Sequence, residues 1–448
     1  MTHDLSRLTE QMLDAARKAG AEAADAIAID GTSLSVDVLH GELEQAERSE
    51  SVEIGLRLMV GARQASVSAS DTSPATIAEM AERGVAMAHQ APEDPDLGLA
   101  DPSALAHDWD VGQLELSDPA PEPDPETLQS DAARAEAAAL AVEGIAQVQS
   151  ASSGYGFRRI HLAATNGFSG GYARTDRALS CVAITGEGTA MERDYFGDVR
   201  IFQSDLIDPE TIGRIAGERT VERAGARKPP TGAFPVLYDE RVASSLIGHL
   251  LQAVNGAAVA RGASWLRDAL GTQVLPKGLS IVEDPHRARV GGSKPFDAEG
   301  LPTARRDIVS DGVLTGWTLD LSTGRKLGLQ STANAARGTS SPPSPSPHNV
   351  ALSAGSHSRE DLVREMGTGL LITSMIGSSI NPTTGNYSRG ASGFWVENGE
   401  IAYPVNECTV AGNLRDLLMT LVPANDARAH LSRVVPSCLV EGLTIAGT

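Results

Sequence analysis

Apolar positions recur with helical spacing in several stretches of the chain, and between them they alternate with period two. The helical spacing predicts helices over residues 5–19, 73–91, 125–145, 208–226 and 239–256. Ser73 is a suitable N-cap because Pro74 follows it in the first turn. The alternation predicts three or four antiparallel strands within residues 24–71 and further strands within residues 146–188. The order helix, strands, helix therefore occurs twice before residue 227, as an internal duplication would produce.

The second half of the chain is dominated by short alternating runs and turn signals. Asp-Gly in "SDG" (310–312) and Asn-Gly in "ENG" (397–399) predict hairpins, because these residues accept the positive φ of tight turns. The proline-rich stretch 339–349 predicts an irregular loop. We expect a curled, mostly antiparallel sheet or barrel in this half.

Together these patterns predict an α+β fold with two domains, since 448 residues exceed one ordinary core. Residues 1–228 are expected to form an N-terminal α/β domain, an antiparallel sheet flanked by helices, with a long solvated linker near residues 92–125. Residues 232–448 are expected to form a β-rich, barrel-like C-terminal domain with a few helices.

Charge and composition exclude several classes of function. The chain has 37 Lys and Arg against 58 Asp and Glu, a formal net charge of −21, so we expect no nucleic-acid partner. Its three cysteines form no CxxC pair, which fits a reducing compartment. The longest weakly polar run, residues 367–380, is too short to span a membrane, and the amphipathic N-terminus is unlike a signal peptide. A cytoplasmic protein without membrane contact is expected.

The predicted helix at 239–256 contains the stretch "SSLIGHLLQAVNG", whose only histidine is His249. His249 shares an apolar face with Val242 and Leu246. A lone histidine on such a face is more often a core residue than a ligand, because zinc sites need three or four ligands. Elsewhere "GFSGG" formally matches a nucleophile elbow around Ser169, but the residues that follow alternate like a strand, so a glycine-rich turn is favoured.

Long motifs extend over the second half of the chain. They are "FDAEGLPTARRDIVSDGVLTGWTLDLSTGRKLGL" (296–329), "NYSRGASGFWVENGEIAYPVNECTVAGNLRDLL" (386–418) and the closing "GLTIAGT". These motifs resemble the TldD/TldE (PmbA) family, and more narrowly its TldE (PmbA) branch, with similarity over essentially the whole chain. In the TldD branch, an H-E-x-x-x-H helix and a late cysteine bind the metal of a metalloprotease. The TldE branch shares the fold, pairs with TldD and lacks the complete site.

Placed on this sequence, the H-E-x-x-x-H motif falls on residues 244–249. Ser244 replaces the first histidine, Ser245 replaces the glutamate, His249 keeps the second histidine, and Cys438 matches the late cysteine. A serine hydroxyl is a poor zinc ligand. Ser245 also cannot act as the general base, a role that typically contributes about 10²–10⁴-fold. The resemblance therefore implies no catalytic residue and no metal site in this chain, with zinc or another divalent metal held by a TldD-like partner.

An independent metal site would need a ligand from elsewhere in the chain. Glu240 lies one helical turn before Ser244, and Asp284 and His286 form a D-x-H pair. The more ordinary interpretation is a charge at a helix start for Glu240 and a solvated loop for the other two.

The resemblance implies one subunit of a cytosolic TldD–TldE heterodimeric metalloprotease that degrades or processes peptides, including leader peptides of modified peptides and antitoxin-type substrates. Two alternatives stay open: a stand-alone homodimeric metallopeptidase that uses His249 and Cys438, and a non-enzymatic peptide-binding or scaffold protein. The candidates for contact with the peptide or the partner are Asn386, Tyr387, Ser388 and Arg389. The alternative for this segment is that its glycines only shape the approach to a turn.

Overall fold

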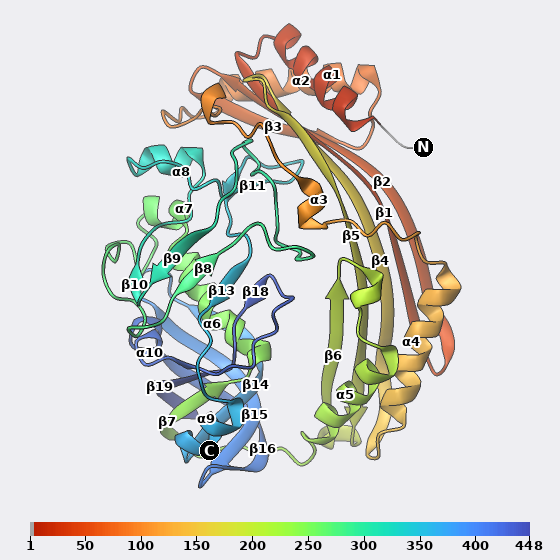
Figure 1. Cartoon of the computed structure of the whole chain (residues 1–448), viewed down its shortest axis with the longest axis vertical. Coiled ribbons are helices and arrows are strands. Elements are labelled where there is room, and N and C mark those ends of the chain that lie inside the picture. Colours follow the sequence, from red (N-terminus) through yellow and green to blue (C-terminus); the bar gives the residue numbers. More distant parts are fainter. Residues whose placement is uncertain (1–3) are drawn as a thin grey trace.

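A six-stranded antiparallel sheet forms the N-terminal half of the protein in this computed structural model, which describes residues 4–448 (Figure 1). The strand order is β3-β2-β1-β4-β5-β6. The strands are β1 (Ala23–Leu39), β2 (Glu42–Val60), β3 (Arg63–Ala69), β4 (Ile145–Ala164), β5 (Ser169–Thr185) and β6 (Glu192–Arg200). Residues 24–71 thus contain three strands, and Gly31 lies inside β1 instead of ending it.

Four helices cover one face of this sheet in two pairs. They are α1 (Leu5–Ala19) and α2 (Pro74–Gln90) over one half, and α4 (Pro125–Leu140) and α5 (Pro209–Val221) over the other. Even-numbered residues of β1 face both pairs, because Ala26 and Ala28 pack beneath the first while Leu34 and Val36 pack beneath the second. The predicted repeat of helix, strands and helix is confirmed, and the two repeats meet where β1 pairs with β4.

The opposite, concave face of the sheet faces the C-terminal half (Figure 1). Ile27 of β1 lies on this face in an apolar cluster that includes Phe296. The connection at residues 92–125 differs from the solvated linker expected from its composition. It contains the short helix α3 (Val111–Leu114), and its Leu105 is buried in the same apolar cluster because the chain here crosses between the two halves.

Five strands of the C-terminal half close into a small barrel. They are β7 (Gly232–Tyr238), β14 (Gly369–Ile380), β15 (Asn386–Glu397), β16 (Glu400–Asn413) and β19 (Cys438–Ala446). Only the pair β7–β14 is parallel, and pairing of β16 with β19 completes the closure. The predicted barrel-like, mostly antiparallel architecture is confirmed. Helix α6 (Glu240–Ala253) packs against the barrel and shares its core.

A second sheet, in the order β10-β9-β8-β13-β18, lies beside the barrel. Its strands are β8 (Ile281–Glu283), β9 (Arg306–Ser310), β10 (Val313–Leu314), β13 (Val350–Leu352) and β18 (Arg433–Val434). The remaining elements are β11 (Ala335–Ala336), β12 (Ser344–Pro345), β17 (Val422–Pro423), α7 (Gly256–Ala260), α8 (Leu321–Lys326), α9 (Arg359–Met366) and α10 (Leu414–Leu418). The four short helices α7 to α10 agree with the few helices expected in this half, but their positions were not predicted, because they carry too few turns to show a helical period.

Both predicted tight turns are present. Asp311 and Gly312 have φ of 48° and 80° between β9 and β10, and Asn398 and Gly399 have φ of 53° and 78° between β15 and β16. The weakly polar run at 367–380 forms β14. Across residues 4–448, no helix combines the length and apolar character needed to cross a membrane.

Gly213 marks the closest approach of α5 to α4 and gives a test of this packing. A Cβ at Gly213 would lie 1.9 Å from the carbonyl oxygen of Ala135. Alanine is favoured over glycine inside a helix by about 1 kcal/mol, yet Gly213→Ala should lower the melting temperature by several degrees because the two helices must separate. Gly248→Ala in α6 is the matched control. Apart from the adjoining backbone of α6, a Cβ there would come within 4 Å of only one group among the described residues, the flexible guanidinium of Arg433 at 3.1 Å. Thermal unfolding that ranks the two variants the other way would contradict this packing.

Candidate functional site

Helix α6 forms because its sequence supplies both a cap and one continuous apolar face. The side chain of Asp239 accepts a hydrogen bond from the backbone N–H of Arg241 at 3.2 Å, and its negative charge favours a helix N-terminus. The buried face of the helix comprises Ala243, Leu246, Ile247, Leu250 and Leu251. This face packs in the barrel core, so the helix that carries His249 is held on a rigid support.

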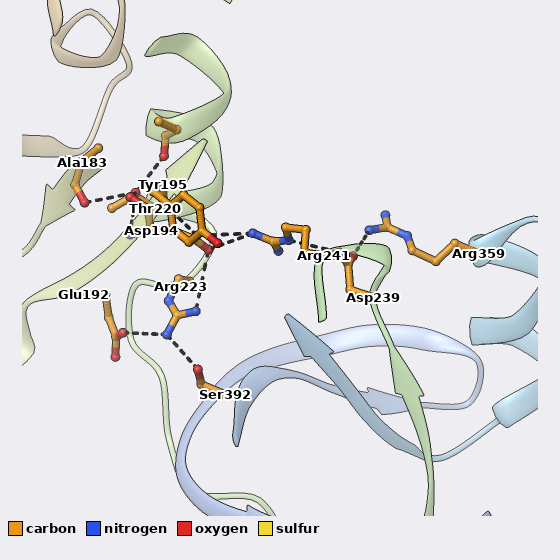
Figure 2. Close-up of polar contacts among 11 residues, drawn as sticks. Ala183, Glu192, Asp194, Tyr195, Thr220, Arg223, Asp239, Arg241, Arg359 and Ser392 are labelled. Atoms are coloured by element: carbon orange, nitrogen blue, oxygen red, sulfur yellow. Dashed lines mark hydrogen bonds and ion pairs between the residues drawn. The ribbon is translucent and has the colours of Figure 1, made fainter. Parts of the chain in front are cut away.

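A chain of ion pairs joins the start of α6 to the N-terminal sheet (Figure 2). The Arg241 guanidinium donates to Asp239 Oδ1 at 3.0 Å and to Asp194 Oδ2 of β6 at 3.2 Å. Arg359 of α9 donates to Asp239 Oδ2 at 3.0 Å, and Arg223 lies 3.7 Å from Asp194. Burial alone would raise the pKa of Asp239, but its arginine partners outweigh burial and hold this pKa below its usual value. The Asp239 carboxylate is therefore charged, and both carboxylates are paired with arginines inside the protein.

His249 is buried on α6, with only 9% of its surface exposed. Its ring meets the ring of Tyr387 edge to face, with centroids 5.7 Å apart. Within the part of the chain that the structure describes, neither ring nitrogen has a hydrogen-bond partner. Burial lowers the pKa of His249 to about 4, the charges of Arg389 and Arg433 act in the same direction, and the Gln252 side chain opposes them weakly. The imidazole is therefore neutral at physiological pH.

The structure brings one member of the "NYSR" segment directly to His249. Tyr387 is buried at the start of β15, and its hydroxyl lies 3.3 Å from the hydroxyl of Tyr238. Arg389 donates from Nε to the carbonyl of Gly377 at 2.7 Å. Asn386 is exposed and accepts a hydrogen bond from the Asn413 amide at 3.1 Å, while Ser388 is half-buried. The segment thus extends from the buried histidine to the protein surface.

The residues around His249 do not fit a metal ion. Cys438 is fully buried, its thiol donates to the Pro436 carbonyl at 3.2 Å, and burial raises its pKa, so it is a neutral thiol. Ser244 and Ser245 are half-buried on α6 and offer only hydroxyl groups. Among residues 4–448, no three His, Cys, Asp or Glu side chains are grouped so that they could hold a metal ion.

The other candidate ligands are engaged in ordinary contacts. Glu240 accepts a hydrogen bond from Arg428 Nε at 2.8 Å. Asp284 accepts from the backbone N–H of His286 at 2.9 Å, and the ring of that histidine lies 3.0 Å from the Thr303 hydroxyl. Within residues 4–448, no hydrogen bond joins any of these three residues to the ring of His249.

Ser169 does not lie on a nucleophile elbow. It begins strand β5 directly after the hairpin that follows β4, so no helix follows it. Its hydroxyl lies 3.5 Å from Nε2 of His161, whose other ring nitrogen lies 2.9 Å from the Thr9 hydroxyl. The glycine-rich turn favoured from the sequence is the arrangement observed.

Sequence reasoning did not find several residues of this site. The hydroxyl of Tyr238 contacts that of Tyr387, whose ring packs on His249, and the charge of Arg433 lowers the pKa of His249. Both residues lie in strands whose neighbours in space are distant in sequence. Asp194, which holds Arg241, comes from the N-terminal half. No local pattern signals such contacts, although a buried acidic residue in an alternating strand is a feature that could have drawn attention to Asp194.

A curved antiparallel sheet joined to a closed barrel, with a histidine-bearing helix packed against that barrel, defines an α+β protein with the scaffold expected for a metallopeptidase-like chain. The chain belongs to the PmbA/TldD metallopeptidase family. Its residues 24–88 match the model for PmbA/TldA metallopeptidase domain 1, residues 118–224 match the central domain, and residues 231–447 match the C-terminal domain.

Known proteins similar to this chain carry both names of the family. Metalloprotease PmbA of Escherichia coli O157:H7 is 39% identical over 420 residues, which cover 93% of this chain and 90% of that protein. A "Metalloprotease TldD homolog" of Haemophilus influenzae is 24% identical over 310 residues, covering 66% of this chain and 64% of that protein. The crystal structure of TldE from Thermococcus kodakarensis has the same fold, with TM-score 0.85, 19% identity and coverage of 98% of this chain and 100% of that chain.

The low pKa of His249 predicts an acid-sensitive contribution to stability. An unperturbed imidazole binds a proton near pH 6.5, whereas the folded protein resists protonation down to about pH 4. Because the unfolded state binds more protons in this window, the contribution is fully present above pH 6.5 and is lost as the pH falls to 4. As the pH falls from 6.5 to 4, the unfolding free energy of the His249→Phe variant should decrease less than that of the wild type. The difference between the two decreases should be on the order of 2 kcal/mol. Urea denaturation across the window measures this difference, and parallel pH profiles would refute it.

Breaking the ion-pair chain at its centre should weaken the link between the two halves. Arg241→Met leaves the buried carboxylates of Asp194 and Asp239 with one arginine partner each. We expect a loss of about 2–4 kcal/mol in unfolding free energy, because each buried carboxylate loses one of its two arginine partners and is only partly compensated. Arg214→Met, which removes only an exposed pair with Glu218, should cost less than about 1 kcal/mol. If urea denaturation gave equal losses of unfolding free energy for the two variants, the buried ion pairs would contribute no more to stability than an exposed pair.

Proposed function

We propose that this chain is a TldE-like subunit that pairs with a TldD-like metalloprotease and has no complete metal site of its own. The observation that carries the proposal is the state of α6. Ser244 and Ser245 stand where the related H-E-x-x-x-H helix places a histidine and a glutamate, and the remaining His249 is buried and neutral. Peptide cleavage would then belong to the partner subunit.

The chemistry of the local side chains supports this division of labour. Zinc binds imidazole, thiolate and carboxylate, and its catalytic sites use three protein ligands. Here the raised pKa keeps Cys438 protonated, and Glu240 is paired with Arg428. Neither Ser244 nor Ser245 can replace a missing ligand or a general base at neutral pH.

In the proposed complex this chain forms part of the wall around the bound peptide. The segment from Asn386 to Arg389 is our candidate for contact with the peptide or the partner, because it leads from His249 to the surface. The substrates would be peptides such as the leader segments of modified peptides or antitoxin-type proteins. The complex would act in the cytoplasm, which agrees with three free, buried cysteines.

Peptidase assays with and without a partner test the proposal. The purified chain, supplied with zinc, should show no chelator-sensitive peptide hydrolysis. Mixed with an H-E-x-x-x-H relative from its own host, it should form a heterodimer in size-exclusion chromatography, and the mixture should hydrolyse peptides. Mutating the partner's glutamate should abolish this activity, whereas His249→Ala in this chain should leave it within a few fold.

Two results would replace the proposal with an alternative. Zinc-dependent hydrolysis by the chain alone, lost in His249→Ala and accompanied by stoichiometric zinc, would establish the stand-alone metallopeptidase. Failure to find any H-E-x-x-x-H protein among the partners that co-purify from the native host would favour a non-enzymatic peptide-binding scaffold.

A further inference from the structure

A small cavity with a basic lining lies between the concave face of the N-terminal sheet and two loops of the C-terminal half. Its volume is about 170 Å³, and its ionisable lining residues are Arg158, Arg174, Asp176, Arg200, Arg289 and His430. Four arginines around one cavity are unexpected in a chain whose formal net charge is −21. Its lining includes neither His249 nor Tyr387.

The carboxylates that balance two of these arginines do not line the cavity. Arg200 is paired with Asp198 at 2.7 Å. Arg289 is held by Glu115 at 2.9 Å and by Asp205 at 3.1 Å. None of these three acidic residues belongs to the lining, which contains one acidic residue, Asp176, beside four arginines.

Arg158 and Arg174 are neighbours on adjacent strands with little anionic compensation. They are register partners on β4 and β5, so their side chains lie on the same face of the sheet. Arg174 donates to the Gly291 carbonyl, and among residues 4–448 no salt bridge joins it to a carboxylate. Arg158 is 62% exposed, and its only salt-bridge partner in that range, Asp176, is 3.9 Å away. Burial and the nearby Arg158 lower the pKa of Arg174, while Tyr172 and Asp176 act in the opposite direction.

The sheet surface beside this arginine pair is open. Residues of β5 with odd numbers, such as Leu179, face the helices, so Arg174 and Ala178 face the concave side. Val199 is the register partner of Ala178 and Tyr195 is that of Val182, which places both on the concave side. Each of these two large side chains on the edge strand β6 is 60% exposed. A basic cavity therefore adjoins an accessible strip of sheet with exposed apolar side chains.

We propose that this cavity binds the carboxylate of an acidic side chain in an extended peptide whose apolar side chains lie on Tyr195 and Val199. The inference rests on the proposed function, because it names acidic peptides as the substrate class of the complex. Two adjacent guanidinium groups match the planar carboxylate by paired, charge-assisted hydrogen bonds. The negative charge of the whole chain would repel a long polyanion such as nucleic acid, but not one carboxylate directed into the cavity.

Fluorescence anisotropy on the isolated full-length chain tests this inference without metal or partner. One probe is a short fluorescein-labelled peptide in which the unit Glu-Tyr-Ser is repeated. The other is the same peptide with every Glu replaced by Gln. Hydrogen bonds in which both groups are charged are stronger than those to a neutral amide, so the Glu peptide should bind at least about tenfold more tightly than the Gln peptide. Arg158→Glu and Arg174→Gln should each remove most of this preference and leave the binding of the Gln peptide unchanged.

Arg214→Gln, at an exposed site on α5, is the matched control and should bind like wild type. Arg158 is largely exposed, so the Arg158→Glu variant should fold, and its melting temperature checks this. Equal affinity for both peptides would overturn the inference, as would wild-type binding by a folded Arg158→Glu variant. Displacement of the Glu peptide by inorganic phosphate but not by equimolar acetate would also overturn it, because the cavity would then select phosphate. Hydrolysis by the isolated chain would refute the proposed partnership instead, so the two failures are distinguishable.

Discussion

The carboxylate of Asp239 is the point at which the two halves of the protein are joined to the helix that carries His249. It caps α6 and also accepts from Arg241 and Arg359, and Arg241 in turn reaches Asp194 of the N-terminal sheet. Buried charges are costly unless each has a partner. The members of this chain therefore depend on one another, and a shift of one half relative to the other would leave carboxylates unpaired. The start of α6 is thus fixed to sheet and barrel together.

The packing that holds α6 also determines what His249 can do. The helix buries an apolar face in the barrel core, and that low-dielectric environment keeps the imidazole neutral. A neutral imidazole is a competent metal ligand, so the histidine alone does not exclude a metal. The other candidate ligands argue against one, because Cys438 is a protonated thiol within a strand and Ser244 offers only a hydroxyl. These side chains support our proposal that the chain has no complete metal site of its own.

Local signals predicted local structure well and said little about assembly. The five long helices follow from apolar periodicity, and the turns at Asn398 and Asp311 follow from the positive φ that Asn-Gly and Asp-Gly tolerate. The parallel pairing of β7 with β14 could not be predicted, because the two strands are separated by more than a hundred residues and by several other elements. His249 could be placed on a buried helix face, but not against Tyr387, since that contact depends on barrel closure. Apolar residues such as Leu105 in a proline-rich segment were hidden by the acidic composition around them.

The basic cavity illustrates the same limit for function. Arg158, Arg174 and Arg289 come from two strands and a distant loop, so no stretch of sequence has a basic cluster and the net charge argues against one. Only strand register places Arg158 beside Arg174, and only the approach of the C-terminal loops encloses them. Overall charge governs long-range repulsion, whereas recognition at contact distance depends on the few charges that face a ligand. An acidic protein can therefore present a carboxylate-binding surface where the fold gathers more arginines than carboxylates, as it does here with four arginines and Asp176.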